Sequence, residues 1–124
     1  MIKDIIIESP NPDGMSENFA DTYRYALEKF DNAADLLDME GVSIRQRLEN
    51  AASELNVLRS GKHIPEMLRP QFDALKSAFV QRGNLIREEG SIATTIGLMS
   101  DHEIASCVQH IREIHNRLLK DSAA

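Results

Sequence analysis

The sequence contains no tryptophan, a single cysteine and no long apolar run. A disulfide needs two thiols, so the lone Cys107 cannot form one within the chain, and its place in a helical apolar row predicts a buried thiol without a redox role. No apolar stretch approaches the ~20 residues that a membrane-spanning helix needs. The opening Met1–Ile7 is short and carries Asp4, unlike a secretory signal. We therefore expect a cytoplasmic protein that does not enter the membrane.

Basic residues are not in excess, because 14 Lys and Arg face 20 Asp and Glu, for a net charge of -6. Nucleic acid phosphates and anionic lipids both bind basic surfaces, so this balance argues against either as a general partner. The acidity is uneven. Residues 1–40 hold ten acidic and three basic side chains, whereas the remainder is close to neutral. The negative charge thus belongs to the N-terminal third.

The chain has 124 residues, near the commonest domain size, and shows no internal repeat or low-complexity segment. One domain over residues 1–124 is therefore expected. After the N-terminal arm no segment alternates polar and apolar residues with the period of a strand, whereas a period near 3.6 recurs throughout. The sequence predicts an all-α fold, a bundle of four to five helices with a short extended N-terminal arm.

The N-terminal arm is rich in β-branched residues, including Ile5, Ile6 and Ile7. It is followed by turn-forming residues with two prolines at Ser9–Gly14, which predicts an extended arm and loop over residues 1–15. Three adjacent isoleucines are costly to leave in water. We expect them to pack on the helices or to mediate self-association.

Two helices are predicted in the first half of the chain. The first follows a Ser16 cap and ends before Gly41, with an apolar row at Phe19, Tyr23, Ala26, Phe30, Ala33 and Leu37. The second follows Ser43, with Gln46 completing a capping box, and is closed by Gly61.

Prolines and helix caps mark the predicted helix boundaries in the second half of the chain. Pro65 and Pro70 predict one turn at Glu66–Leu68 and a helix from about Gln71 that stops at Gly90. A short helix over Ser91–Met99 should follow. Ser100 and Glu103 then form a capping box that opens the last helix, whose apolar row is Ile104, Cys107 or Val108, Ile111, Ile114 and Leu118.

The outer face of the first predicted helix is strongly acidic. Its members, which include one arginine, are Glu17, Asp21, Arg24, Glu28, Asp31, Asp35 and Asp38. Like charges four residues apart weaken a helix, so this face is either a docking surface for a basic partner or a solvated face opposite arginines of the second and third helices. The second interpretation is favoured, because rows of charge are usually solvent faces.

The four histidines, His63, His102, His110 and His115, do not have the spacing of metal ligands on one helix, and no Glu-x-x-His pair accompanies them. We predict no metal and no cofactor. His115 borders the apolar row of the last helix, and we expect it to be hydrogen-bonded at the edge of the core.

The sequence shows no Gly-x-Ser-x-Gly nucleophile and no glycine-rich phosphate loop, so an enzyme is unsupported but not excluded. The stretch Ile92–Ala105 has the spacing of a helix-turn-helix, but Asp101 and Glu103 would then face phosphates. Two core helices joined by a capped turn are favoured, and nucleic acid binding is disfavoured.

Several short segments resemble a family of small, uncharacterised bacterial helical proteins. They are an Arg-Leu helix at Arg45–Leu48, the turn Ile64–Arg69 followed by Phe72, and Glu89–Ile92. The resemblance covers about residues 43–119 and rests on common residue types. It implies a bacterial helical fold and no particular activity.

These observations support three functional hypotheses. The leading one is a non-catalytic interaction protein, a homodimer or a module docking on another protein, that uses the isoleucine arm, the acidic face or both. The alternative is a small regulator that binds a ligand or nucleic acid through its last two helices. A third is a small molecule in an apolar pocket lined by Phe30, Phe72 and Phe79, which could equally be core residues.

Overall fold

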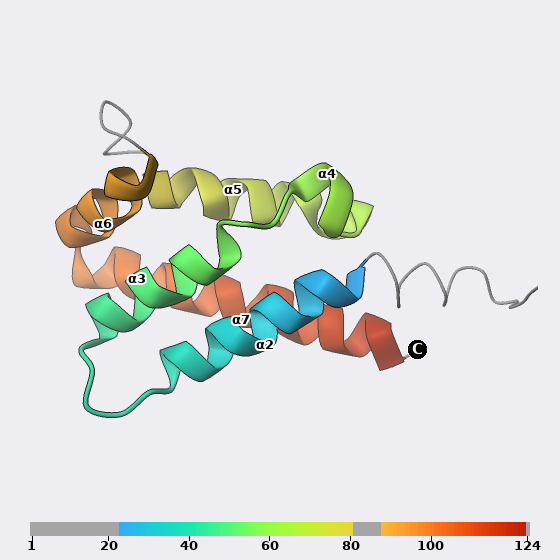
Figure 1. The fold of residues 1–124 in the computed structure, drawn as a ribbon, viewed down its shortest axis with the longest axis horizontal. Coiled ribbons are helices and arrows are strands. Elements are labelled where there is room, and N and C mark those ends of the chain that lie inside the picture. Colours follow the sequence, from blue (N-terminus) through green and yellow to red (C-terminus); the bar gives the residue numbers. More distant parts are fainter. Residues whose placement is uncertain (1–22, 81–87, 124) are drawn as a thin grey trace, which may run out of the picture.

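The computed structural model describes residues 23–80 and 88–123, and these residues form helices without any strand. The predicted all-α bundle is confirmed. The predicted arm over residues 1–15, with Ile5, Ile6 and Ile7, lies outside the described residues, as do Glu17 and Asp21. The elements are α2 (Arg24–Leu37), α3 (Ile44–Leu55), α4 (Ser60–His63), the 3₁₀ turn η2 (Glu66–Leu68), α5 (Arg69–Val80), α6 (Glu88–Leu98) and α7 (Asp101–Ala123) (Figure 1).

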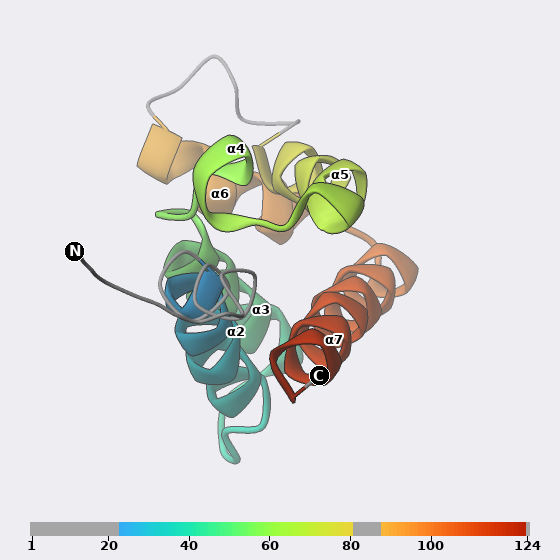
Figure 2. The same cartoon turned by 90° about the vertical axis from the view of Figure 1, so that its right-hand side faces the viewer.

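The helices form two layers. In Figure 2, α2, α3 and α7 lie in the lower layer, and α4, α5 and α6 lie above them. The long helix α7 contacts α2 and α3 in its own layer and α5 in the other. No helix in the described part of the chain is long and apolar enough to cross a lipid bilayer.

The core contains apolar side chains from both layers, and Phe30 and Phe72 meet edge to face with ring centroids 6.2 Å apart. Phe79 is also buried, so the three phenylalanines of the third hypothesis are core residues. Cys107 occupies the buried position in the last helix and Val108 lies at its edge. Each large buried side chain contributes about 1.5–3 kcal/mol through removal from water. The predicted row of α7 thus faces the core, as does the predicted row of α2 from Ala26 to Leu37. Tyr23 is only half-buried, and Phe19 lies outside the described residues.

The two predicted capping boxes differ in the structure. At α7 both halves form, with the Ser100 N–H donating to Glu103 Oε1 (2.8 Å) and the Glu103 N–H donating to Ser100 Oγ (3.1 Å). At α3 the Gln46 N–H donates to Ser43 Oγ (3.2 Å), but the Gln46 amide donates to Asn50 instead of returning to Ser43. The cap of α3 is therefore only half of the predicted box.

Glycine is a weaker marker of helix ends here than predicted. Gly41 does form the turn after α2, with a φ of 82° that glycine adopts at little cost. The prediction that Gly61 closes the second helix is wrong, because α3 ends at Leu55 and Gly61 lies inside α4. Gly90 lies in the first turn of α6 and so does not end the preceding helix.

Basic side chains bind the connections between helices. Helix C-termini leave carbonyls without helical partners, and cations near them are stabilising. Lys76 Nζ donates to the carbonyls of Asn56 (3.2 Å) and Leu58 (2.8 Å) just after α3, and so supplies a charged donor to the connection between α3 and α4. Similar bonds join Arg47 to the Val42 carbonyl (2.7 Å) and Arg69 to the Ile64 carbonyl (2.8 Å).

Candidate functional site

A hollow with a volume of about 400 Å³ lies between α5 and α7, with α6 closing one end. We call it the α5–α7 groove. Its buried lining residues are Leu75, Thr95, Met99 and Cys107. Its remaining lining residues are Gln71, Ala74, Ala78, His102, Glu103, Ser106, His110 and Glu113. The groove therefore has a largely apolar floor and a polar edge formed by α7.

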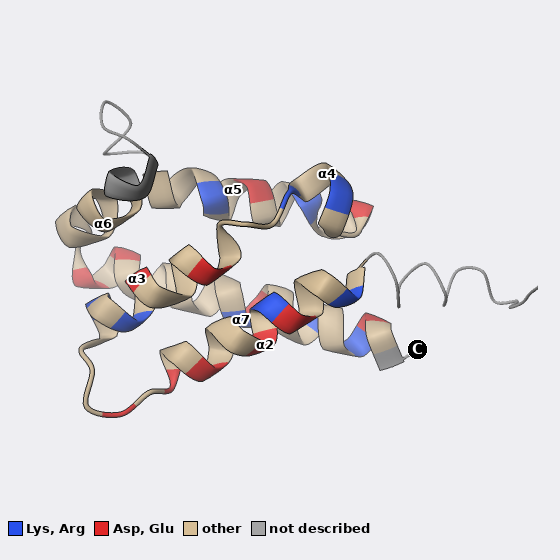
Figure 3. Cartoon of the chain, in the orientation of Figure 1, with Lys and Arg blue, Asp and Glu red and all other residues tan. Residues whose placement is uncertain are grey.

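The groove continues toward the C-terminal end of α7. A second hollow of about 350 Å³ shares Gln71 and Glu113 with the first and adds Asn116, Arg117 and Lys120. From Glu103 to Lys120 the α7 wall is roughly 26 Å long at 1.5 Å per residue. Acidic residues lie at the end of α7 that adjoins α6 and a basic residue lies near its C-terminal end (Figure 3). The groove is thus long, and its charge changes sign along its length.

The α7 side chains along the groove form one stripe. They alternate spacings of three and four residues, which places them on one face of the helix, and we call them the α7 stripe. Its members are Glu103, Ser106, His110, Glu113, Arg117 and Lys120. Within α7, Glu113 accepts a bond from Gln109 (2.9 Å) and Arg117 pairs with Asp121 (3.5 Å). The stripe thus remains at the surface. These two contacts run along α7, and Arg117 also contacts Met67 Sδ of η2 at 3.9 Å.

A third, shallower hollow lies on the other side of α7, beside the start of α3. It has a volume of about 590 Å³ and its lining includes Ile44, Ala105, Val108 and Arg112. Glu113 borders this hollow as well as the α5–α7 groove. Helix α7 is therefore a ridge with a hollow on each side.

Cys107 is the one nucleophilic sulfur in the chain and borders the groove floor. Burial raises the pKa of its thiol, and the nearby Glu103 carboxylate raises it further. A thiol nucleophile reacts as the thiolate, which this environment disfavours. The residues that the structure describes include no group of three His, Cys, Asp or Glu side chains arranged to hold a metal ion. The surroundings of Cys107 therefore favour the neutral thiol over the thiolate.

Two acids of the predicted acidic face are paired inside the molecule. Asp31 Oδ1 lies 2.6 Å from Nε2 of His115, and Asp38 accepts a bond from Arg112 (2.8 Å). Their partners lie on α7, not on the second and third helices as expected. Glu28 and Asp35 are exposed. His115, whose side chain is 15% exposed, is the predicted hydrogen-bonded histidine at the edge of the core.

Another acid of the same layer has a shifted pKa. Glu54 on α3 accepts bonds from Asn32 (2.9 Å) and Lys29 (3.2 Å), both on α2. The hydrogen bond from Asn32 is the main cause that holds the pKa of the Glu54 carboxyl below its ordinary value, and the bond from Lys29 lowers this pKa further. Polar contacts across α2, α3 and α7 thus stabilise the lower layer.

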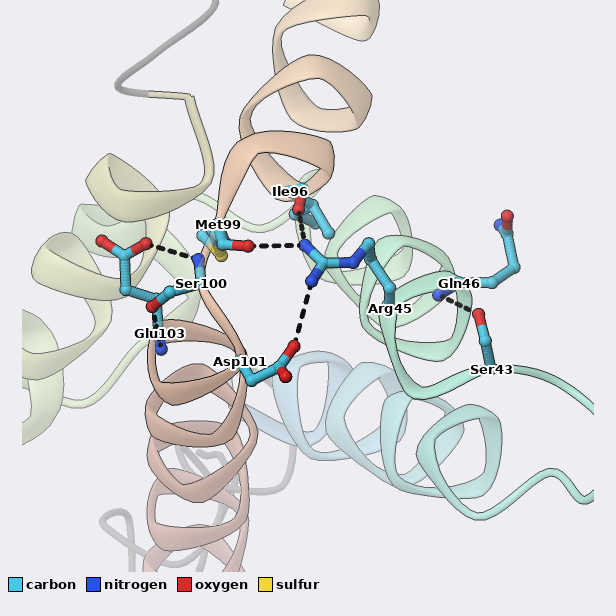
Figure 4. A network of polar contacts seen from close by, with 8 residues as sticks. All are labelled: Ser43, Arg45, Gln46, Ile96, Met99, Ser100, Asp101 and Glu103. Carbon is cyan, nitrogen blue, oxygen red and sulfur yellow. Dashed lines mark hydrogen bonds and ion pairs between the residues drawn. The ribbon is translucent and has the colours of Figure 1, made fainter.

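The junction between α6 and α7 is bound by Arg45 of α3, as Figure 4 shows. Arg45 Nη1 donates to the carbonyls of Ile96 (2.8 Å) and Met99 (2.7 Å), and Nη2 lies 3.3 Å from Asp101 Oδ1. The stretch examined as a helix-turn-helix is therefore two core helices joined by a capped turn. The role of Arg45 has no signal in the sequence, since nothing local to Ile92–Ala105 indicates a residue on α3.

His63 lies in a short polar cluster at α4. Its Nδ1 accepts a bond from the Arg59 N–H (2.9 Å), and its ring lies 5.0 Å from that of Tyr25. Burial lowers the pKa of His63, and the nearby Lys62 and Arg59 lower it further. This histidine is structural, because its acceptor nitrogen holds the turn that begins α4.

No protein-family model matches the chain, and no match to a curated protein or to a solved structure was found. The function is therefore inferred from the geometry of the α5–α7 groove and the α7 stripe.

Proposed function

We propose that this protein is a non-catalytic interaction module that binds a protein helix in the α5–α7 groove. The observation that carries the proposal is the groove itself, which lies between two helices and combines a buried apolar floor with a polar edge. Protein interfaces share this arrangement of an apolar centre and a polar rim. An amphipathic helix placed along such a groove buries its apolar face on the floor.

The length of the groove favours a helix over a loop. The α7 wall from Glu103 to Lys120 spans roughly 26 Å, which matches a partner helix of about 17 residues. The α5 wall exposes Gln71 and Ala74, and small or flexible side chains there leave room for a second backbone. A third helix can thus pack against α5 and α7 at ordinary interhelical distances.

The leading hypothesis from the sequence, a non-catalytic interaction protein, is retained, but the proposed contact is the α5–α7 groove and not the acidic face. Asp31 and Asp38 already pair with α7, so a basic partner would have to displace those bonds. The isoleucine arm stays a prediction. Arg112 and Arg117 are each paired with a carboxylate, which weakens the case for phosphate binding by the last helix.

A small ligand in the same groove is the second candidate. The volume of about 400 Å³ lies in the usual range of small-molecule sites, roughly 300–1,000 Å³. The lining includes Thr95 of α6, Met99 just after α6 and His102 of α7, which supports this candidate at the two helices that the alternative hypothesis names. Native mass spectrometry of the purified protein separates it from helix binding, because a retained ligand adds a defined small mass.

The proposal is tested by site-specific photocrosslinking in cells that carry the gene. The photoreactive residue p-benzoylphenylalanine replaces Ala74 in the groove, and in the matched control it replaces the exposed Asp35 on α2. We expect a discrete protein-to-protein adduct from position 74 and none from position 35. Adducts from position 35 alone, or none from position 74, would overturn the proposal.

A further inference from the structure

We infer that the occupant of the α5–α7 groove is the α7 helix of a second copy of this chain, antiparallel to the first and related to it by a two-fold axis. This inference rests on the proposed function and names the partner. In a two-fold interface the same surface meets itself, so residue i faces residue j and j faces i. The surface must then be complementary to its own rotated image.

The α7 stripe has this property. Its spacings read the same from both ends, so an antiparallel copy places the first member against the last, the second against the fifth and the third against the fourth. The resulting pairs are Glu103 with Lys120, Ser106 with Arg117, and His110 with Glu113. Each pair combines an acceptor with a donor or opposite charges. One register therefore gives each member of the stripe a complementary partner, in addition to the bond that Glu103 accepts from the Ser100 N–H and the pair that Arg117 forms with Asp121 within one chain.

Other arrangements of the same two helices are less favourable. A parallel two-fold pairing places each residue against its own copy, so Glu113 meets Glu113 and Lys120 meets Lys120, and like charges at close range are destabilising. Antiparallel helices also bring each positive helix N-terminus near a negative C-terminus. The charge pattern thus selects one orientation as well as one register.

The shape of the surface agrees with the charges. Helix α7 is a ridge bordered by the α5–α7 groove on one side and by the hollow beside Ile44 on the other. When two such ridges cross, each enters the hollow beside the other. The exposed Gln71 and Ala74 of α5 then lie against a helix instead of water, above the already buried Leu75.

The inference is tested by a charge-exchange cycle at one pair, followed by sedimentation equilibrium over a range of protein concentrations. His110→Glu places two glutamates opposite each other, and Glu113→Lys places a histidine opposite a lysine. Each change occurs twice per dimer, so each single variant should weaken dimerisation about tenfold. The double variant His110→Glu/Glu113→Lys restores opposite charges and should recover most of the wild-type affinity.

Two controls keep the result interpretable. Asp35→Lys makes the same charge change as Glu113→Lys on the exposed face of α2 and should leave dimerisation unchanged. Circular dichroism of every variant confirms that helix content is retained. A dimer that neither single variant weakens, or a double variant as weak as the singles, would overturn the antiparallel register.

The outcome also separates this inference from the proposed function. A wild-type chain that remains monomeric at every concentration overturns the second-copy inference. An adduct of a different protein at position 74 would at the same time support the groove as an interaction surface. Failure of the proposed function is instead marked by the absence of any adduct from that position.

Discussion

Two faces of α7 use charge in different ways. On the face toward α2, Asp31 and Asp38 reach across to His115 and Arg112, so charged groups join elements distant in sequence. On the face toward the groove, Glu113 accepts its bond from Gln109 of the same helix, and Arg117 pairs with Asp121 of the same helix while also contacting Met67 Sδ at 3.9 Å. Contacts of the first kind stabilise the fold, whereas the second kind leaves a surface with its pattern intact. The contrast separates residues that hold the fold from those that we propose bind a partner.

The largest loss of stability should follow truncation of a core side chain, whereas a substitution on the groove face of α7 should have little effect on stability. Phe30→Ala removes a fully buried ring that packs on Phe72, and it should lower the free energy of unfolding by about 3–5 kcal/mol. Glu113→Lys on the groove face should change it by less than about 0.5 kcal/mol. Urea denaturation followed by circular dichroism, at a fixed protein concentration low enough to keep the chain monomeric, measures both. Similar losses for the two variants would contradict the distinction.

The junction held by Arg45 should show the next largest effect. Arg45→Ala removes two bonds from a charged donor to the carbonyls of Ile96 and Met99, and it should cost about 2–3 kcal/mol of unfolding free energy. Arg45→Lys keeps the charge but loses the planar fork of donors, so its loss should be smaller. Equal stability of the alanine variant and the wild type in chemical denaturation would show that the junction does not depend on this side chain.

The pairing between α2 and α7 should give a smaller coupling. A double-mutant cycle of Asp31→Asn and His115→Gln measures the interaction across the 2.6 Å contact, with an expected coupling near 0.5–1 kcal/mol. Asp35→Asn in place of Asp31→Asn is the matched control and should show no coupling to His115. A coupling of zero for the Asp31 cycle would mean that the acidic face is independent of α7.

The smallest effect is a pH dependence at His63. Because the folded state lowers the pKa of His63, the unfolded chain binds the proton more tightly, and stability falls as pH is lowered below about 6.5. Above that pH the full stability is present. His63→Gln should flatten the loss of stability between pH 7 and 5 relative to the wild type. Thermal unfolding at several pH values measures this, and equal slopes for the variant and the wild type would contradict the assignment.

The sequence predicts the fold better than it predicts the site, for physical reasons. Helix periods and core-facing rows are local patterns, so Phe30, Ile96 and Ile111 could be assigned to the core from spacing alone. The bonds of Arg45 and Lys76 to distant carbonyls depend on tertiary packing and have no local pattern. The same limit applies just beyond the end of α3 at Leu55, where the Leu58 carbonyl binds Lys76, 18 residues further along the chain.

The groove was missed for a similar reason. Its walls come from α5 and α7, and their meeting depends on how the two layers of the bundle pack. The spacing of Glu103, His110 and Glu113 was nevertheless visible in the sequence. A search for polar rows that read the same from both ends of a helix would have identified the α7 stripe without a structure.

The most direct test of the account is a dilution series followed by two-dimensional amide NMR of the wild-type chain. If two copies meet through the groove, the largest concentration-dependent shifts should fall on the α7 stripe and on Gln71 and Ala74 of α5, with little change at Glu28 and Asp35 of α2. Shifts concentrated on the α2 face, or spectra that do not change between micromolar and millimolar protein, would contradict it.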